Sequence, residues 1–249
     1  MKETKVSFKS GKVLLYGILH TPDRSTGKII VFANGWPDNY VDIHIMTAAA
    51  RYFCSKGYAF LRFNPKGRWP SNGIFINQGV LDQAEDTSSA VRFARRKGYG
   101  RIALIGHSMG GLAILAAKGA GADVLALWEP GSARMLKSHF GKKKYRQQFR
   151  KQGYAVEEQY GQVISKKYIV DLTKIPGDAK LISSISLPIL LAAGTPPNSI
   201  LRDVVKYYYK FAKGPKELVI IKGASHTFDN YNHEKELFRR TLAWFRKTL

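Results

Sequence analysis

The part of the sequence best suited to chemistry is Gly-His-Ser-Met-Gly, residues 106–110. An apolar run, RIALIG, leads into this motif, and a run of small residues, GGLAILAA, follows Met109. A strand that turns directly into a helix holds the intervening serine in a strained conformation, so the flanking residues must be small. The pattern therefore predicts a sharp bend that presents the Ser108 hydroxyl as a nucleophile. The same bend would leave the Met109 N–H at a helix N-terminus, where negative charge is favoured. The alternative is a glycine-rich turn with an inert serine.

The elements that would position this serine are an alternating series of strands and helices. Strand-like apolar segments are KVSF, KVLLYGILH, KIIVFAN, YAFLRF, RIALIG, VLALW, PILLAA and KELVIIKG. Helical spacing of apolar residues predicts helices over 42–56, 81–96, 109–118 and 200–213, and from His233 onward. Short strands rich in Val, Ile and Leu between amphipathic helices indicate an α/β protein with a mostly parallel sheet covered on both faces.

The alternation stops after Trp128 and resumes at about residue 185. The intervening residues, 131–185, are basic, aromatic and irregularly helical. They lack the apolar periodicity of an independent core, so we expect them to form an insertion above the sheet within a single domain spanning residues 1–249.

One run within this insertion, residues 134–151, carries eight Lys or Arg and no acid. We expect a solvated helix face with Phe140, Tyr145 and Phe149 packed beneath it. Two alternatives are an anion-attracting wall beside a binding site and a patch for nucleic acid or membrane.

The composition further limits the kinds of site and the location that we expect for this protein. The single Cys54 excludes an internal disulfide and a cysteine-built zinc site, and its apolar surroundings indicate a buried thiol. Because the N-terminal residues form no apolar run and no segment is long enough to span a membrane, we expect a cytoplasmic protein. The net charge of +22 favours nonspecific attraction of polyanions and says nothing about fold.

The segments IALIGHSMGG and KGPKELVIIKGASHTF resemble those of α/β-hydrolases, in particular small serine esterases, acylglycerol lipases and dienelactone-hydrolase-like enzymes. The resemblance covers nearly the whole chain. It implies the α/β-hydrolase fold, which is a mostly parallel eight-stranded sheet with helices on both faces, here with a small helical cap at about 131–185. It implies neither a cofactor nor a metal.

The resemblance also implies a base and an oxyanion hole. His226 follows the last predicted strand by a short loop, where such enzymes place the histidine that takes the serine proton. After the first parallel strand the chain reads Asn34-Gly35-Trp36, where similar enzymes often carry His-Gly-x. The expected oxyanion donors are therefore the N–H groups of Trp36 and Met109. Alternatively, Gly35-Trp36-Pro37 is a tight turn that buries an aromatic ring.

The third member of the triad has three candidates, because Pro197 occupies the place where relatives usually carry the acid. Glu129 ends the strand that follows the serine motif, a position from which some α/β-hydrolases take their acid. Asp203 lies about six residues beyond the usual place, at a helix start that favours an acid in any case. A third possibility is that no carboxylate serves and Asn198 orients His226.

The loop RFNPKGRWPSNG departs in the same way from the Asp-x-Arg-Gly-His-Gly pattern of relatives, notably at Lys66 and Arg68. Its usual role is therefore not assumed. Together these features favour a serine hydrolase that cleaves small carboxylic esters, anionic ones included, with no specific nucleic-acid partner. The rival expectation is a non-catalytic protein of the same fold that binds an acidic small molecule or a polyanion.

Overall fold

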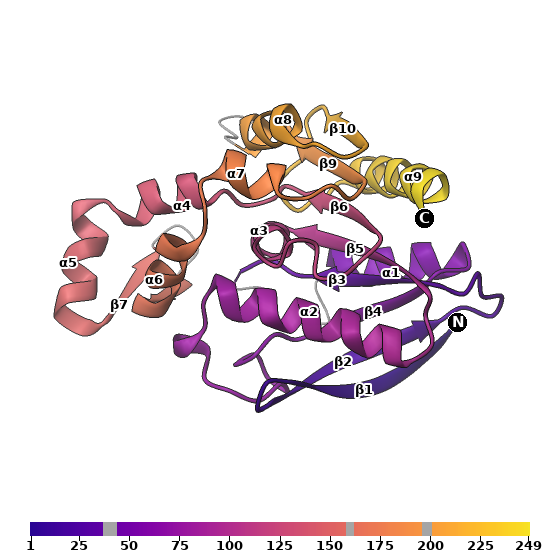
Figure 1. The fold of residues 1–249 in the computed structure, drawn as a ribbon, viewed down its shortest axis with the longest axis horizontal. Helices are drawn as coiled ribbons and strands as arrows, with labels where there is room; N and C mark the ends of the chain where they lie inside the picture. The colour runs from indigo at the N-terminus through magenta and orange to yellow at the C-terminus, as the bar shows by residue number, and fades with distance from the viewer. Residues whose placement is uncertain (37–43, 158–161, 196–200) are drawn as a thin grey trace.

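One eight-stranded sheet organises the chain (Figure 1), and its strands follow the order β1-β2-β4-β3-β5-β6-β9-β10. The computed structural model describes residues 1–36, 44–157, 162–195 and 201–249. The strands of the sheet are β1 (Lys2–Ser10), β2 (Val13–Thr21), β3 (Lys28–Ala33), β4 (Ala59–Phe63), β5 (Arg101–His107), β6 (Val124–Trp128), β9 (Ile189–Gly194) and β10 (Lys216–Ile221). The first two neighbouring pairs are antiparallel and the remaining pairs are parallel, which confirms the predicted mostly parallel sheet.

Helices cover both faces of this sheet. They are α1 (His44–Ser55), α2 (Val80–Arg96), α3 (Met109–Ala116), α4 (Ala133–Phe140), α5 (Lys143–Gln152), α6 (Lys166–Lys174), α7 (Asp178–Ser183), α8 (Leu201–Phe211) and α9 (Tyr231–Thr248), with a short 3-10 turn, η1 (Phe75–Asn77). Side chains of α2, α3 and α8 pack in one core cluster, and those of α1 and α9 pack in a second. Inner strands are buried on both faces, which explains why they are continuous apolar runs.

The insertion, residues 131–185, contains α4, α5, α6 and α7, and it projects from one end of the molecule in Figure 1. Phe140 and Tyr145 are buried and Phe149 is partly buried, which confirms the expectation of aromatic residues beneath a basic helix face. The structure adds a feature that the expected helical cap lacked. Strand β7 (Tyr154–Glu157) pairs antiparallel with β8 (Gln162–Ser165) in a separate two-stranded sheet.

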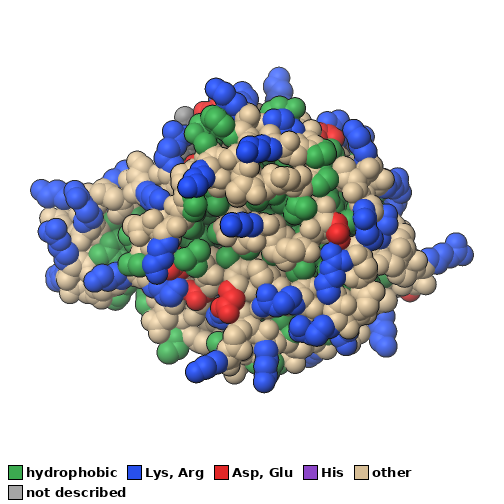
Figure 2. Space-filling view, in the orientation of Figure 1, with side chains coloured by type: hydrophobic (Ala, Val, Ile, Leu, Met, Phe, Trp, Pro, Cys, Tyr) green, Lys and Arg blue, Asp and Glu red, His purple; other side chains and the backbone are tan. Residues whose placement is uncertain are grey.

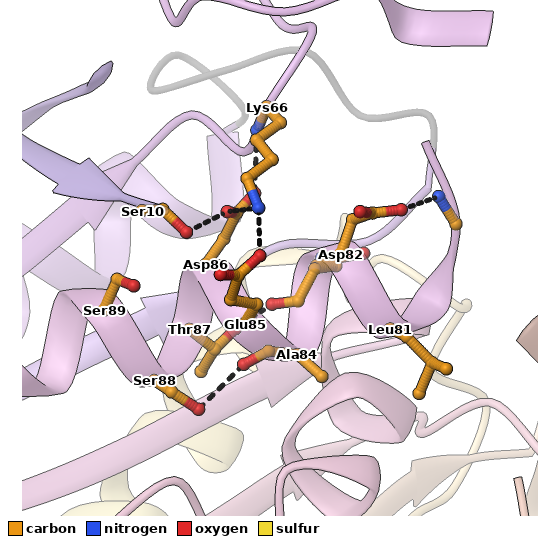
Figure 3. Close-up of polar contacts among 12 residues, drawn as sticks. Ser10, Lys66, Leu81, Asp82, Ala84, Glu85, Asp86, Thr87, Ser88 and Ser89 are labelled. Carbon is orange, nitrogen blue, oxygen red and sulfur yellow. Dashed lines mark hydrogen bonds and ion pairs between the residues drawn. The ribbon is translucent and has the colours of Figure 1, made fainter. Parts of the chain in front are cut away.

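The altered loop after β4 is fixed to α2 by a buried group of charges (Figure 3). The Lys66 ammonium forms ion pairs with Glu85 and with Asp86, the latter at 3.3 Å, while its backbone N–H donates to Asp86 at 2.8 Å. Ser10 donates its hydroxyl to the same carboxylate at 2.6 Å. Burial raises the pKa of Asp86 to about 6, even with this cation and these donors beside it. The loop is therefore held by a carboxylate that depends on Lys66 for its charge balance.

Replacing Lys66 with methionine is expected to destabilise the fold by about 3 kcal/mol at pH 8, because the buried Asp86 carboxylate loses its cation. An acid whose folded-state pKa is raised contributes stability that is complete below its ordinary pKa and is lost as pH rises through the folded pKa. The loss should therefore be smaller at pH 5 than at pH 8. Urea denaturation at the two pH values measures the difference.

Two further variants serve as controls for this measurement. Glu85→Gln removes an acid that is about half exposed, and it should lower the free energy of unfolding by less than about 1 kcal/mol. The double variant Lys66→Met with Asp86→Asn should regain most of the lost stability, since no unpaired charge remains. An equal loss for Lys66→Met at both pH values would show that the charge of Asp86 is not the cause.

Candidate active site

The bend between β5 and α3 has the geometry expected of an exposed nucleophile. Ser108 lies at φ 53° and ψ −117°, a backbone conformation that residues with a side chain rarely adopt. A Cβ on Gly110 would lie 2.0 Å from the carbonyl oxygen of Ala33, and one on Gly106 would lie 2.6 Å from a methyl group of Ile114. Both positions therefore require glycine. The predicted bend is confirmed, while the nucleophilic role of Ser108 stays a prediction.

The backbone around Ser108 is tied down on both sides. Its N–H donates to Trp128 O at 3.0 Å, and its carbonyl accepts from the N–H groups of Gly111 at 3.0 Å and Gly131 at 2.8 Å. Met109 is the first residue of α3, so its N–H has no carbonyl partner within the helix. The arrangement leaves this donor at the positive end of the helix, next to the serine.

His226 lies on the loop between β10 and α9, and its side chain is 41% exposed. Its Nδ1 atom lies 3.7 Å from Oε2 of Glu129, a carboxylate that is only 1% exposed. Neither of these two atoms has a hydrogen-bond partner among the described residues. A shift of less than about 1 Å would bring them to hydrogen-bond distance, and such bonds are often long before a substrate binds.

Glu129 is held firmly at the end of β6. Its Oε1 atom accepts a hydrogen bond from the N–H of Gly194 at the end of β9, and its own N–H donates to Ala192 O at 2.8 Å. Its φ of 47° is a second strained, non-glycine conformation at the carboxyl edge of the sheet. One carboxylate oxygen is thus fixed by the sheet, and the other faces His226.

Of the other candidates for this role, Asp203 lies on the surface and Asn198 lies outside the described residues. Asp203 lies in the first turn of α8, its side chain is 68% exposed, and its carboxylate lies 3.5 Å from Nε of the adjacent Arg202. This placement fits an acid that stabilises a helix start. Pro197 and Asn198 lie outside the described residues, so the proposal that Asn198 orients the base is not tested.

His107, the second residue of the Gly-His-Ser-Met-Gly motif, contacts the loop of His226. Its Nε2 lies 2.9 Å from the backbone carbonyl oxygen of His226, and the two imidazole rings are 4.9 Å apart. Because a carbonyl only accepts, Nε2 of His107 carries the proton and donates. Burial, followed by the charge of the neighbouring His226, lowers the pKa of His107 to about 3, so the ring is neutral. The sequence did carry a signal that the His107 side chain is buried, because it lies two residues after Ile105 on a buried strand.

Replacing His107 with alanine is expected to lower kcat for ester turnover about 100-fold with little change in KM, because the loop that positions His226 loses its anchor. His107→Gln retains an N–H donor and should restore most of the rate. Steady-state kinetics on the two variants, with thermal melting to confirm folding, makes the comparison. Equal turnover in both variants would exclude a positioning role for this hydrogen bond.

Trp36 lies between the loop after β4 and the insertion. Its ring stacks on Phe75 at 4.9 Å between centroids and packs against Tyr168 of α6 at 5.2 Å. The Arg68 guanidinium lies 4.9 Å from the same ring. The Tyr168 hydroxyl lies 3.7 Å from the sulfur of Met109. One side chain of the insertion therefore contacts both residues expected to form the oxyanion hole, although the role of the Trp36 N–H stays a prediction.

Within the described ranges, no three His, Cys, Asp or Glu side chains converge in a way that would hold a metal ion. Cys54 is buried as predicted, and burial raises the pKa of its thiol to about 12. Such a thiol is not a nucleophile at neutral pH.

No protein-family model and no curated protein sequence matches the chain. Solved structures do match it over nearly its full length. Est1E from Butyrivibrio proteoclasticus with bound ferulic acid is 18% identical, with a TM-score of 0.81 and coverage of 97% of this chain and 99% of that one. The esterase domain of a Rhodothermus marinus protein is 22% identical, with a TM-score of 0.75 and coverage of 99% of both chains.

A dienelactone hydrolase from Anabaena variabilis is 17% identical, with a TM-score of 0.70 and coverage of 100% of this chain and 98% of that one. These similarities agree with the arrangement of sheet and helices described above. The chain is therefore a protein of the α/β-hydrolase fold.

Proposed function

We propose that this protein is a serine hydrolase that cleaves carboxylic esters through an acyl-enzyme intermediate. The observation that carries the proposal is the pairing of the buried Glu129 carboxylate with the imidazole of His226 at 3.7 Å, on the carboxyl edge of the sheet that also carries the strained Ser108. A buried carboxylate that faces a half-exposed histidine can orient the imidazole to take the proton of a nearby serine hydroxyl, the role proposed here toward Ser108.

In the proposed reaction, the Ser108 hydroxyl oxygen attacks the ester carbonyl as Nε2 of His226 takes its proton. Glu129 holds Nδ1 of the ring and stabilises the imidazolium that forms. The N–H groups of Met109 and Trp36 would donate to the oxyanion. The intermediate collapses with breakage of the bond to the alcohol, which leaves with the proton from His226. A water molecule then attacks the acyl-enzyme by the reverse sequence and releases the acid and the free serine.

The similar structures support ester chemistry by analogy. One is an esterase with ferulic acid bound and another is an esterase domain, and fold likeness at this identity gives no substrate. The insertion contacts the proposed oxyanion residues through Tyr168, so we expect it to shape the acyl or alcohol pocket. Its basic character favours acceptance of anionic esters.

A panel of p-nitrophenyl esters of increasing acyl length tests this function. We expect turnover that depends on chain length, with a burst of p-nitrophenol equal to the enzyme concentration where deacylation is slow. No turnover across the panel, together with salt-sensitive retention on heparin, would instead favour the non-catalytic polyanion-binding protein.

A further inference from the structure

The charges of the insertion are separated by sign between its surface and its interior. All of its Lys and Arg residues are exposed, namely Arg134, Lys137, Lys142, Lys143, Lys144, Arg146, Arg150, Lys151, Lys166, Lys167, Lys174 and Lys180. Its carboxylates within the described residues, Glu157, Asp171 and Asp178, are all buried. In Figure 2, the outer end of the projecting part shows Lys and Arg side chains and no acidic one.

The buried acids are occupied within the protein. Asp178 accepts hydrogen bonds from the Ser132 hydroxyl and from the N–H of Ala133, which lie at the start of α4. Asp171 accepts from the N–H of Leu81 at 3.2 Å and pairs with Lys167 at 2.9 Å. Among the described residues, these three acids stand against twelve exposed Lys and Arg, so the insertion keeps a large excess of positive charge.

Exposed apolar side chains lie on the loop after β4, which contacts the insertion, and on α6 within it. Ile74 is 62% exposed and directly precedes η1, which contacts β8 of the insertion. The hydroxyl of Ser165 in the insertion also donates to Gln78 O at 3.1 Å, immediately after η1. Trp69, on the same loop, is 77% exposed, and Val170 of α6 is 41% exposed among exposed lysines. Apolar side chains of this size gain free energy when they leave water.

We propose that the basic surface of the insertion, together with Trp69 and Ile74, docks the protein on a bilayer rich in anionic phospholipid. Anionic headgroups attract clustered Lys and Arg side chains, and tryptophan is favoured at the level of the headgroups. Attraction and apolar insertion together give firmer attachment than either alone. Ile74 and Val170 favour lipid over nucleic acid, because aliphatic side chains do not stack on bases as aromatic rings do. This attachment does not depend on catalysis by Ser108.

Vesicle flotation with the full chain tests the proposal, with Ser108→Ala included so that hydrolysis plays no part. We expect binding to vesicles of phosphatidylcholine with 30% phosphatidylglycerol to be at least 10-fold tighter than binding to phosphatidylcholine alone, and to be lost at high salt. Tryptophan emission should shift to the blue on binding. Trp128 and Trp244 are already buried, and the Trp36 ring is partly buried against Phe75 and Tyr168, so most of this shift should disappear in Trp69→Phe.

Two triple variants separate the surface from net charge. Lys143→Glu, Arg146→Glu and Arg150→Glu alter α5, and Lys56→Glu, Lys213→Glu and Lys247→Glu alter exposed positions outside the insertion. Both sets lower the net charge from +22 to +16. We expect the first set to weaken vesicle binding at least 10-fold and the second to weaken it less than 2-fold. Equal weakening by both sets, no blue shift on binding, or preferential binding to single-stranded RNA at the same salt would each overturn the proposal.

Discussion

Ser108→Ala is expected to lower kcat for ester hydrolysis by a factor on the order of 10⁶, the scale of loss when a serine nucleophile is removed from a triad. The φ of 53° at this residue supports the prediction, because strained backbone conformations cluster at active sites. The change removes one oxygen from a half-buried site, so thermal stability should stay close to that of the parent protein.

Turnover of p-nitrophenyl esters and the melting temperature of Ser108→Ala, measured on the same preparation, separate catalysis from folding. Ser132→Ala is unsuitable as a control, because that hydroxyl caps α4 and donates to Asp178. Ser183, a partly exposed residue of α7 whose hydroxyl donates to the Lys180 carbonyl, offers a better one, and Ser183→Ala should retain full activity. Undiminished turnover in Ser108→Ala would contradict the assignment.

Glu129→Gln is expected to lower kcat about 10⁴-fold, because the amide no longer stabilises the protonated imidazole of His226 and favours the wrong tautomer. The substitution retains the shape of the side chain. Its carbonyl oxygen can still accept the hydrogen bond from the Gly194 N–H, so the end of β6 should remain in place. Kinetics on the variant measures the loss, and circular dichroism checks the fold.

Asp203→Asn is the matched comparison, because Asp203 was the other carboxylate considered for the role. Its exposed position beside Arg202 predicts less than a 2-fold change in kcat. A large loss in Asp203→Asn with full activity in Glu129→Gln would reverse the assignment. Full activity in both would indicate a site without a catalytic carboxylate.

Much of the fold could be predicted from the sequence because its inner strands are buried on both faces. The segment VLALW forms β6 and RIALIG forms most of β5. Continuous apolar runs of this length are typical of strands that are buried on both faces of a parallel sheet. The bend at Ser108 was also predictable, since glycines at 106 and 110 answer a local steric need.

Features that depend on distant partners were not predictable in this way. The hydrogen bond between His107 and the His226 carbonyl joins residues 119 positions apart, and the local sequence indicates only that His107 lies on a buried strand. The hairpin of β7 and β8 was missed because its strands are only four residues long and half polar. The ion pairs of Lys66 depend on the packing of its loop against α2.

The acid of the proposed triad could be predicted only in part. Sequence reasoning narrowed the choice to Glu129, Asp203 or an amide, and it could not decide further, because the decision depends on which strands are neighbours. The pairing of β6 with β9 places Glu129 beside Gly194 and directs its free oxygen toward His226. Asp203 remains on the surface.

Covalent labelling with a fluorophosphonate tests the central claim most directly, because that reagent requires a serine activated by a neighbouring base. Intact mass and peptide mapping of the labelled protein would show one adduct on Ser108, with labelling lost in Ser108→Ala and strongly slowed in His226→Ala. A protein that stays unmodified at neutral pH, or an adduct on another serine, would contradict the account.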